Sequence, residues 1–276
     1  MEIIVAKTAG FCFGVERAVQ LAFENKDKPN TYTFGPIIHN EAVVHSLEKK
    51  GIYSTNNINK DIKNLIIRSH GVGKAIYEKA KLNDISIVDA TCPYVKKIHR
   101  LVEKHYELGY KIILIGNEGH PEIVGINGWA NNECLIMSDL SELRANGLKK
   151  DCKYFVVSQT TFKRQVVQDI INYLKENEYD FEYIDTICNA TKARQEEAAK
   201  IAKQVDCMFV IGSSYSSNTR KLLEICKNEC SNTYGIENAL DINCTMLQNC
   251  NTIGITAGAS TPSYLIEEVI TVINSK

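Results

Sequence analysis

Short apolar runs alternate with amphipathic stretches along the whole chain. Runs such as "IILIG" (112–116) and "MFVIG" (208–212) have the length and β-branched content of buried strands. The stretches that follow them place apolar residues at helical spacing. Strands that alternate with helices imply parallel sheets and right-handed crossovers. The pattern therefore predicts an α/β protein with mostly parallel sheets.

The same order of elements returns three times. An apolar strand ends at Gly35, Gly116 or Gly212, and corresponding glycines lie 81 and 96 residues apart. Four residues after each glycine comes a polar side chain, then a weaker strand, and then a third strand that enters a polar turn and a helix. The polar residues at this offset are His39, His120 and Ser216. A repeat in register at this period indicates three similar structural units.

We expect these units to span residues 13–92, 93–188 and 189–276. Residues 1–12 complete the last unit with an N-terminal strand, expected at residues 2–7. Because ligands bind at the carboxyl ends of parallel strands, three units around a pseudo-threefold axis would aim their polar turns at one central cavity. The alternative is three unrelated α/β repeats whose polar turns only cap helices. The recurrence of the offset favours the first interpretation.

The composition is that of a globular protein and gives no sign of a nucleic-acid-binding or membrane-spanning one. The chain has 276 residues, of which 44% are hydrophobic and 24% charged, and its net charge is −1. These values are typical of a globular protein and give no electrostatic reason to expect nucleic acid or an anionic membrane as a partner. No apolar run approaches the roughly 18 residues of a membrane span, and residues 1–30 lack a signal-peptide pattern. We therefore expect a cytoplasmic protein.

Ten cysteines are many for a protein in a reducing compartment, where metal binding, catalysis or burial explains cysteines better than disulfides. No C-x-x-C is present, so the spacing of a zinc ribbon is missing. We expect seven of the ten to be small buried hydrophobic residues. These are Cys134, Cys152, Cys207, Cys226, Cys230, Cys244 and Cys250.

We expect each of the other three, Cys12, Cys92 and Cys188, to end a strand and to precede a helix, one in each repeat. If the units converge, three thiolates form one site with an open coordination position, either on a [4Fe–4S] cluster or on zinc. The missing C-x-x-C favours the cluster. The helix start behind each cysteine and nearby basic residues would stabilise thiolates and a reduced cluster. These basic residues are Arg17, Lys96, Lys97 and Arg194.

A second set of residues suits a phosphate ligand. Each lies at or just before a predicted helix start, where backbone N–H groups and the helix dipole attract anions. The set is His39, His70, His120, Ser216, Ser217, Asn218 and Ser260. The simpler interpretation of any one of them is a helix cap. The remaining histidines, His45, His99 and His105, fall in helical stretches and are expected to be structural, and no P-loop is present.

Glu122, in "GHPE", is a candidate proton donor, because a carboxylate in a dry cavity takes on a raised pKa. The alternative is a charge at a helix N-terminus, since Pro121 suits the first helical position. Glu41 occupies the same offset in the first repeat. The repeat alone does not choose between the two carboxylates.

Eight segments in order resemble the hydroxymethylbutenyl diphosphate reductases, the last enzymes of the methylerythritol phosphate route to isoprenoids. They are "GFCFGVERA", "RSHGV", "DATCP", "GHPE", "SQTT", "ICNA", "SSN" and "TAGAS". The resemblance covers essentially the whole chain. It implies a trefoil of three α/β units and a [4Fe–4S] cluster on Cys12, Cys92 and Cys188, with one iron that no cysteine binds.

The resemblance also implies roles in a reaction, the reductive dehydroxylation of an allylic diphosphate to isopentenyl and dimethylallyl diphosphate. The open iron binds the substrate hydroxyl, Glu122 supplies protons, and Thr160 and His120 lie beside the reacting group. The seven phosphate-site residues named above bind the diphosphate. Of the two carboxylates, the resemblance favours Glu122. A ferredoxin or flavodoxin is the expected electron donor, because a low-potential cluster needs such a partner.

Three other functions fit parts of the pattern. A quinolinate-synthase-like enzyme also has a three-cysteine cluster in a threefold α/β arrangement, but "GHPE" and "TAGAS" count against it. A non-enzymatic, cluster-based redox sensor needs neither the anion site nor a buried proton donor. A zinc hydrolase predicts bound zinc and no chromophore.

Overall fold

The computed structural model describes residues 1–275, which form twelve strands and ten α-helices. The strands make three four-stranded sheets, and all pairings recorded within them are parallel. The predicted α/β class with mostly parallel sheets is confirmed. The chain divides into two compact units, Met1–Glu16 with His39–Val43 and Cys188–Lys276, and Arg17–Ile38 with Val44–Ile187. The first unit holds one sheet and the second holds two, while the predicted boundaries of three units stay a prediction.

The sheet of the first unit has the order β1-β12-β10-β11. The N-terminal strand pairs with the last strand of the chain, in the register Glu2↔Thr252 to Val5↔Ile255, as the sequence predicts. It is shorter than the expected residues 2–7, because a turn closed by the Ala9 N–H and the Ala6 carbonyl (3.1 Å) ends it. The strands are β1 (Glu2–Val5), β10 (Cys207–Ile211), β11 (Thr233–Ile236) and β12 (Thr252–Ala257).

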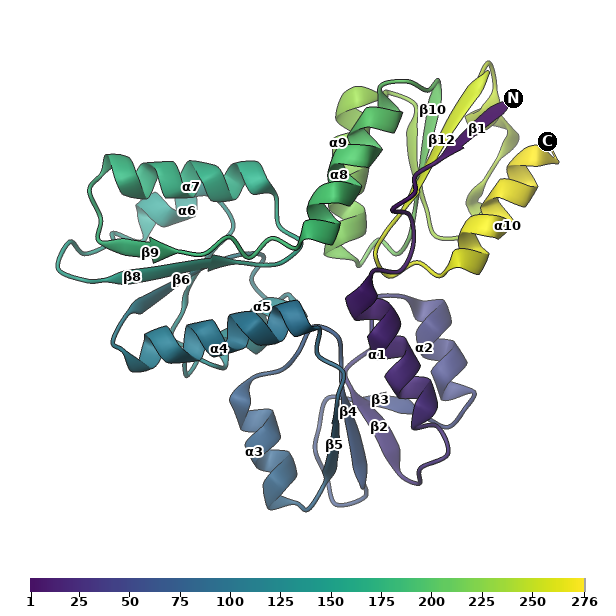
Figure 1. Cartoon of the computed structure of the whole chain (residues 1–276). Helices are drawn as coiled ribbons and strands as arrows, with labels where there is room; N and C mark the ends of the chain where they lie inside the picture. The colour runs from purple at the N-terminus through teal and green to yellow at the C-terminus, as the bar shows by residue number, and fades with distance from the viewer. Residues whose placement is uncertain (276) are drawn as a thin grey trace. The chain divides into compact units, whose positions relative to one another are not determined.

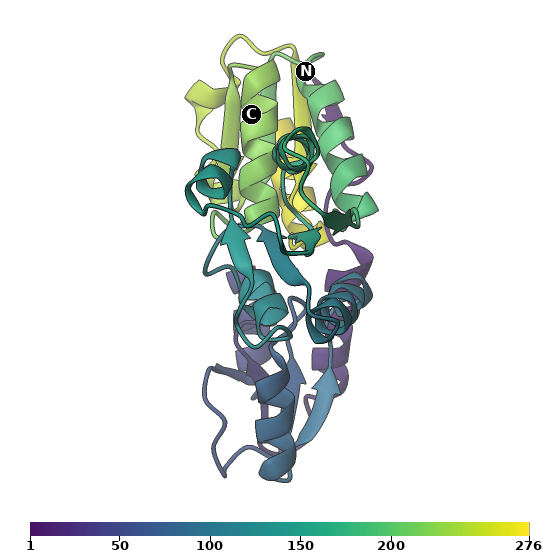
Figure 2. The same ribbon diagram turned by 90° about the vertical axis from the view of Figure 1, so that its left-hand side faces the viewer.

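Helices cover both faces of this sheet. Figures 1 and 2 show α10 on the face opposite α8 and α9. Alternate residues of β10 point to the two layers: Met208 and Val210 pack with α8 and α9, whereas Phe209 and Ile211 pack with α10. This burial on both faces explains why the strand reads as a continuous apolar run. The helices are α8 (Asn189–Ala202), α9 (Ser217–Glu229) and α10 (Ser263–Asn274).

The first sheet of the second unit has the order β3-β2-β4-β5, and Figure 1 shows α3 against one face of it. Leu65 and Ile67 of β4 pack with α3 through Ala80. The strands of this sheet are β2 (Thr31–Phe34), β3 (Tyr53–Thr55), β4 (Asn64–Ile67) and β5 (Ser86–Asp89). The helices around them in sequence are α1 (Phe13–Glu24), α2 (Glu41–Glu48) and α3 (Lys74–Leu82).

The second sheet of this unit has the order β7-β6-β8-β9, with α4 and α5 on one face and α6 and α7 on the other (Figure 1). Ile112 and Leu114 of β6 pack with α4 and α5, and Ile113 and Ile115 pack with α6 and α7. The strands are β6 (Lys111–Ile115), β7 (Leu135–Met137), β8 (Tyr154–Ser158) and β9 (Phe181–Tyr183). The helices are α4 (Pro93–Glu107), α5 (Pro121–Asn127), α6 (Leu140–Ala145) and α7 (Arg164–Glu176). No helix within residues 1–275 is long and apolar enough to cross a membrane.

Glycines let two turns of the second unit meet closely. A Cβ on Gly128, which follows α5, would lie 2.6 Å from the Cα of Gly73, which caps α3. The indole N–H of Trp129 donates to the Val72 carbonyl (2.9 Å), and the ring stacks on His99 at 5.2 Å. The two backbones therefore approach to a distance that no side chain larger than hydrogen allows.

His99 is 3% exposed, and burial lowers the pKa of its imidazole to about 4, with Asp89 opposing and Lys96 adding to the shift. The folded-state pKa lies below the unfolded value, so the unfolded chain binds the proton first as the pH falls. We predict that His99 costs no stability above pH 6.5 and removes up to about 3 kcal/mol as the pH falls from 6.5 to 4.

Urea unfolding between pH 4 and pH 7 measures this dependence. His99→Phe keeps an aromatic ring against Trp129 and should flatten the profile between pH 4 and 6.5, whereas His45→Gln, at an exposed position, should leave it unchanged. A profile in His99→Phe as steep as that of the natural chain would contradict the assignment.

Candidate functional site

Each of the three predicted ligand cysteines stands at the residue before a helix. Cys12 precedes α1, Cys92 precedes α4, and Cys188 precedes α8. In all three, the cysteine carbonyl accepts the N–H of the residue four positions later, at 2.9, 2.9 and 3.1 Å. The thiols of Cys92 and Cys188 do not cap their helices. A thiol at an N-cap does little for the helix, where a hydroxyl or carboxylate is preferred.

One detail of the sequence interpretation was wrong: the cysteines do not end strands. The strands stop earlier, at Val5, Asp89 and Tyr183, and a turn leads from each strand to its cysteine. In two repeats the turn is the same, because an aspartate side chain accepts the N–H two residues later. Asp89 accepts from Thr91 (3.0 Å) and Asp185 accepts from Ile187 (3.1 Å). These aspartates stabilise the turn before the helix, so the turn does not need a hydrogen bond from the cysteine side chain.

The turn before Cys92 is held from several sides. Asp89 accepts hydrogen bonds from the Tyr77 hydroxyl (3.1 Å) and pairs with Lys96 (2.7 Å). Burial acts to raise the pKa of Asp89, but the hydrogen bonds from Lys96 and Thr91 outweigh it and hold the pKa below its usual range. The guanidinium of Arg17 donates to the carbonyls of Asp89 and Thr91, both at 3.3 Å. These contacts fix the backbone that presents the cysteine.

In the first unit, one buried cation lies near two of the cysteines. Arg194 on α8 is 3% exposed, and its pKa is lowered by burial and raised by the nearby Cys12 and Cys188. Both thiols therefore lie within electrostatic reach of one guanidinium. A positive charge at that place favours thiolates and an anionic metal cluster.

The other seven cysteines differ in their surroundings. Cys207, Cys226 and Cys230 are buried, as predicted, and burial raises the pKa of the first two thiols to about 12. For Cys244 the prediction of burial was wrong: it is exposed, because it begins a short 3-10 helix, Cys244–Leu247. Three others are only half-buried, namely Cys134, Cys152 and Cys250. No cysteine forms a disulfide within residues 1–275.

The first unit also carries four of the predicted phosphate-site residues on two helix starts. Ser216 caps α9, where its hydroxyl accepts the Thr219 N–H (3.4 Å), and Ser217 and Asn218 open the helix. The hydroxyl of Ser260 donates to the carbonyl of His39 (3.0 Å). All four side chains are buried, although they are polar.

Asn218 has the clearest sign of a missing partner. Both polar atoms of its side chain, Nδ2 and Oδ1, are buried and have no hydrogen-bond partner among the described residues. Native proteins seldom leave such groups unsatisfied, because each costs about 1–3 kcal/mol. At the N-terminus of a 13-residue helix, the amide and the backbone N–H groups are well placed for an anion.

The second unit brings Glu122 and Thr160 together. Glu122 is 2% exposed, and its Oε1 accepts the Thr160 N–H (2.6 Å) while its Oε2 accepts the Thr160 hydroxyl (2.8 Å). Glu41, the rival carboxylate, is exposed at the start of α2. The structure therefore separates the two candidates that the repeat leaves equal.

His120 caps α5, since its Nδ1 accepts the Glu122 N–H (3.1 Å). A ring nitrogen that accepts carries no proton, so the neutral tautomer of His120 has its proton on Nε2. Its ring meets that of His70 edge-on at 5.5 Å between centroids. Both histidines thus lie in one cluster, and Nε2 carries the proton of neutral His120.

Gln159 is a site residue that our sequence interpretation did not select. It is fully buried, its Oε1 accepts the Asn117 N–H (3.2 Å), and its Nε2 donates to the Thr161 hydroxyl (2.9 Å). It therefore ties the loop before His120 to the loop that carries Thr160. The signal was present in "SQTT", where a polar pair follows an apolar strand.

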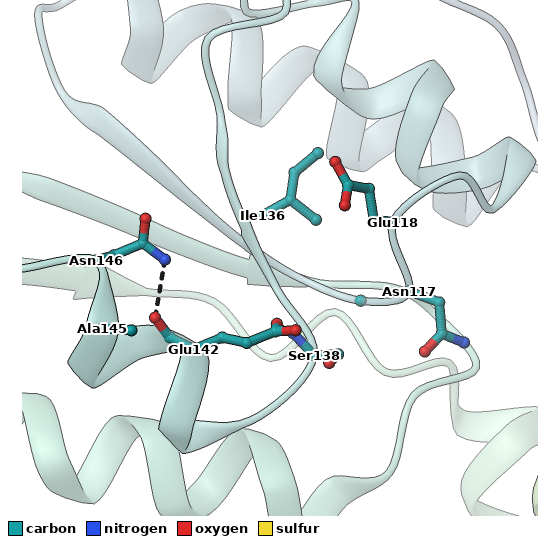
Figure 3. Close-up of a pocket in the computed structure, with 8 residues that line it drawn as sticks. Asn117, Glu118, Ile136, Ser138, Glu142, Ala145 and Asn146 are labelled. Atoms are coloured by element: carbon teal, nitrogen blue, oxygen red, sulfur yellow. Dashed lines mark hydrogen bonds between the residues drawn. The ribbon is translucent and has the colours of Figure 1, made fainter.

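A cavity of about 380 Å³ opens beside this cluster, at the ends of β6 and β7 (Figure 3). Figure 3 shows Glu118 and Glu142 in its wall, and Asn146 donates to the Glu142 carbonyl (2.8 Å). It contains none of the predicted histidines, cysteines or Glu122. Two carboxylates make it unsuitable for an anion, so it is not the candidate site.

Each unit therefore holds a part of the predicted set. The first contains Cys12, Cys188, His39, Ser216, Ser217, Asn218 and Ser260. The second contains Cys92, His70, His120, Glu122 and Thr160. The convergence of the two parts on one cavity stays a prediction.

Comparisons with known proteins cover nearly the whole chain. A family model described as LytB protein matches residues 3–274. The 4-hydroxy-3-methylbut-2-enyl diphosphate reductase of Caldanaerobacter subterraneus subsp. tengcongensis is 48% identical, over 100% of this chain and 97% of the relative. The enzyme of that name from Clostridioides difficile is 44% identical over 98% of each chain.

Two solved structures share the fold. One is (E)-4-hydroxy-3-methyl-but-2-enyl diphosphate reductase, described as the terminal enzyme of the non-mevalonate pathway, with a TM-score of 0.72, 36% identity and full coverage of both chains. The other is the E-1-hydroxy-2-methyl-but-2-enyl-4-diphosphate reductase from Plasmodium falciparum, with a TM-score of 0.91 and 32% identity over 99% of this chain and 87% of that one. The fold and the relatives define an oxidoreductase. The chain belongs to the LytB protein family.

The surroundings of the cysteines predict an order of thiol reactivity. In metal-free protein at pH 8, iodoacetamide should label Cys12 and Cys188 at least roughly tenfold faster than Cys207 and Cys226, because the thiolate is the reactive form and burial raises the latter pKa values to about 12. Peptide mass spectrometry over time measures the rates. Exposed Cys244 is the control for unhindered labelling. Equal labelling of Cys226 and Cys12 in folded protein would contradict this order.

Proposed function

We propose that this chain is a 4-hydroxy-3-methylbut-2-enyl diphosphate reductase that works with a [4Fe–4S] cluster held by Cys12, Cys92 and Cys188. One observation carries the proposal: a cysteine stands at the same helix-start position in all three repeats, and the thiols of Cys92 and Cys188 do not cap their helices. Three thiolates suit a cluster with one iron left open, and the buried Arg194 suits its negative charge. The names of the full-length relatives support the substrate.

The proposed reaction replaces the allylic hydroxyl of the substrate by hydrogen. It consumes two electrons and two protons and releases water, with isopentenyl or dimethylallyl diphosphate as the product. When bound, the cluster supplies the electrons and an open iron for the substrate hydroxyl. The chain itself must bind the diphosphate, orient the hydroxyl and deliver protons. Each turnover consumes two electrons that must be resupplied from outside the chain, and we propose a small ferredoxin or flavodoxin as the donor.

The diphosphate would bind to donors from several helix starts. The amide of Asn218, the hydroxyls of Ser216 and Ser217 and the backbone N–H groups at the start of α9 provide neutral donors. Ser260 and the three histidines complete the proposed set, with His120 donating through Nε2. Such donors stabilise phosphate charge in a water-poor site without a metal ion.

Glu122 and Thr160 form the proposed proton path. Both oxygens of Glu122 accept from Thr160, so the two side chains are in direct hydrogen-bond contact. The Thr160 hydroxyl donates to Glu122, so its own lone pairs stay available to accept the hydrogen of the substrate hydroxyl. A proton that arrives at Glu122 reverses this hydrogen bond and turns Thr160 into a donor. The pair thus passes a proton to the leaving oxygen without a change in backbone position.

Anaerobic turnover tests the proposal. Protein reconstituted with iron and sulfide should convert 4-hydroxy-3-methylbut-2-enyl diphosphate to isopentenyl and dimethylallyl diphosphate when a chemical reductant or reduced flavodoxin is supplied. Chromatography of the dephosphorylated products measures it. A protein that holds the cluster and still forms neither product would refute the assignment.

Glu122→Gln separates proton supply from packing. Glutamine keeps the volume, accepts the Thr160 N–H and donates to the Thr160 hydroxyl, so the fold should be retained while kcat falls about 10²–10⁴-fold. Glu118→Gln is the matched control, since Glu118 is exposed in the loop before α5. Steady-state kinetics and thermal unfolding of both variants measure the effect. A Glu122→Gln enzyme with near-natural kcat would remove Glu122 from the proton path.

Asn218→Ala tests the anion site. The substitution removes two unpartnered buried atoms, so the ligand-free protein should be as stable or slightly more stable, while substrate KM rises roughly tenfold. Thermal unfolding without ligand, together with kinetics, measures both effects. If Asn218 were instead structural, the variant would lose stability and keep its KM.

A further inference from the structure

Two side chains of helix α8 form hydrogen bonds with the N–H groups and the carbonyls of residues 7–10, the segment that leads to Cys12. Glu197 accepts the N–H groups of Lys7 (3.0 Å) and Thr8 (2.9 Å) and the Thr8 hydroxyl (2.6 Å). Arg194, three residues earlier on the same helix, donates to the carbonyls of Thr8 (2.8 Å) and Gly10 (2.6 Å). Residues three apart lie on one helix face, so a single face of α8 satisfies this whole stretch of backbone.

This contact links two of the proposed cluster ligands. Helix α8 begins directly after Cys188, and the segment it holds ends two residues before Cys12. Gly10 has a φ of +97°, a conformation that favours glycine, and this lets the chain turn from the held segment toward Cys12. All these residues belong to the first compact unit. Side chains of α8 therefore hold the backbone that precedes Cys12, and Cys188 is the residue directly before α8.

Arg194 has one nitrogen that this arrangement does not use. Its Nε and Nη2 donate to the carbonyls, whereas Nη1 is buried and has no hydrogen-bond partner among the described residues. The side chain is 97% buried, since only 3% is exposed. Burial lowers the pKa of Arg194, and the nearby Cys12, Cys188 and Glu197 act to raise it. An N–H without a partner next to two ligand cysteines points to an acceptor of negative charge.

The other basic residues near the cysteines do not share this property. Lys96 pairs with Asp89 at 2.7 Å, and Lys97 is exposed. Arg17 makes similar contacts with the carbonyls before Cys92, but its hydrogen bonds are longer, at 3.3 Å, and it is only half-buried. Solvent screens exposed charges, whereas a buried one acts at nearly full strength.

We propose that Arg194 is a positioning residue for the cluster. It holds the turn before Cys12 through the carbonyls of Thr8 and Gly10, and its Nη1 donates to a sulfur of the bound cluster or of its cysteines. The inference rests on the proposed function, because it requires a [4Fe–4S] cluster on Cys12, Cys92 and Cys188. A guanidinium stays protonated even when buried. Its charge stabilises the more negative, reduced state of the cluster and so makes the cluster easier to reduce.

Arg194→Gln, Arg194→Lys and Lys192→Gln, each purified anaerobically as the full chain and reconstituted, test the inference. Lys192→Gln is the matched control: it removes the same charge from the same helix, closer in sequence to Cys188, but at an exposed position paired with Glu196. Iron and sulfide content comes first, and then a reductive titration followed by electron paramagnetic resonance. These readouts do not depend on turnover.

At a given solution potential, the reduced-to-oxidised ratio of Arg194→Gln should be about tenfold below that of the natural chain, a shift of about 59 mV for one electron. Lys192→Gln should match the natural chain, and Arg194→Lys should recover most of the shift because it restores the charge. A fully loaded Arg194→Gln with the natural potential would overturn the inference.

Where Arg194→Gln takes up little cluster, hydrogen exchange of the metal-free proteins tests its hold on the turn before Cys12. Amides of residues 8–12 should exchange several-fold faster than in the natural chain, because the carbonyls of Thr8 and Gly10 lose their donor, whereas Lys192→Gln should match the natural chain. Unchanged exchange in Arg194→Gln would overturn the inference. If the natural chain itself takes up no cluster, the proposed function fails, whereas a loaded and active natural chain with no effect at Arg194 refutes only the role of Arg194.

Discussion

Parallel strand pairing is the constraint on which the other features depend. A parallel strand is followed by a crossover, usually a helix, so all strands of a sheet end at the same edge and the next helices begin there. In the three sheets described, residues after the strand ends include the proposed ligand cysteines, the three candidate histidines, Glu122 and the serines at the start of α9. Burial of both faces by helices stabilises each sheet and leaves the edge as the place for polar groups. The proposed functional residues therefore lie at the carboxyl ends of the strands.

Much of this organisation could be predicted from the chain itself. Strands of branched apolar residues, helices with periodic apolar faces and glycines after β2, β6 and β10 are local features, and they gave the α/β class and the pairing of the two terminal strands. The exact strand ends could not be predicted. They depend on turns closed by single contacts, such as the Ala9 N–H to the Ala6 carbonyl or Asp185 to the Ile187 N–H. Those contacts leave no periodic signal.

The residue types of the candidate site could be predicted from the sequence, but the hydrogen-bond and charge partners of each side chain could not. Glu41 and Glu122 share an offset in the repeat, yet only Glu122 meets a threonine 38 residues away, so its burial follows from a long-range contact. The same holds for Arg194, whose partners lie more than 180 residues earlier in the chain. Spacing shows which side chains begin a helix, whereas the acceptor or charge that each one meets depends on packing between distant segments.

The central claim is that one cysteine from each repeat holds a four-iron cluster with one open iron. The most direct measurement is a Mössbauer spectrum of anaerobically reconstituted protein, with iron and sulfide content, before and after addition of 4-hydroxy-3-methylbut-2-enyl diphosphate. The account predicts four irons and four sulfides per chain, with one iron distinct and changed by the substrate. Four equivalent irons that the substrate does not affect, or zinc without sulfide, would contradict it.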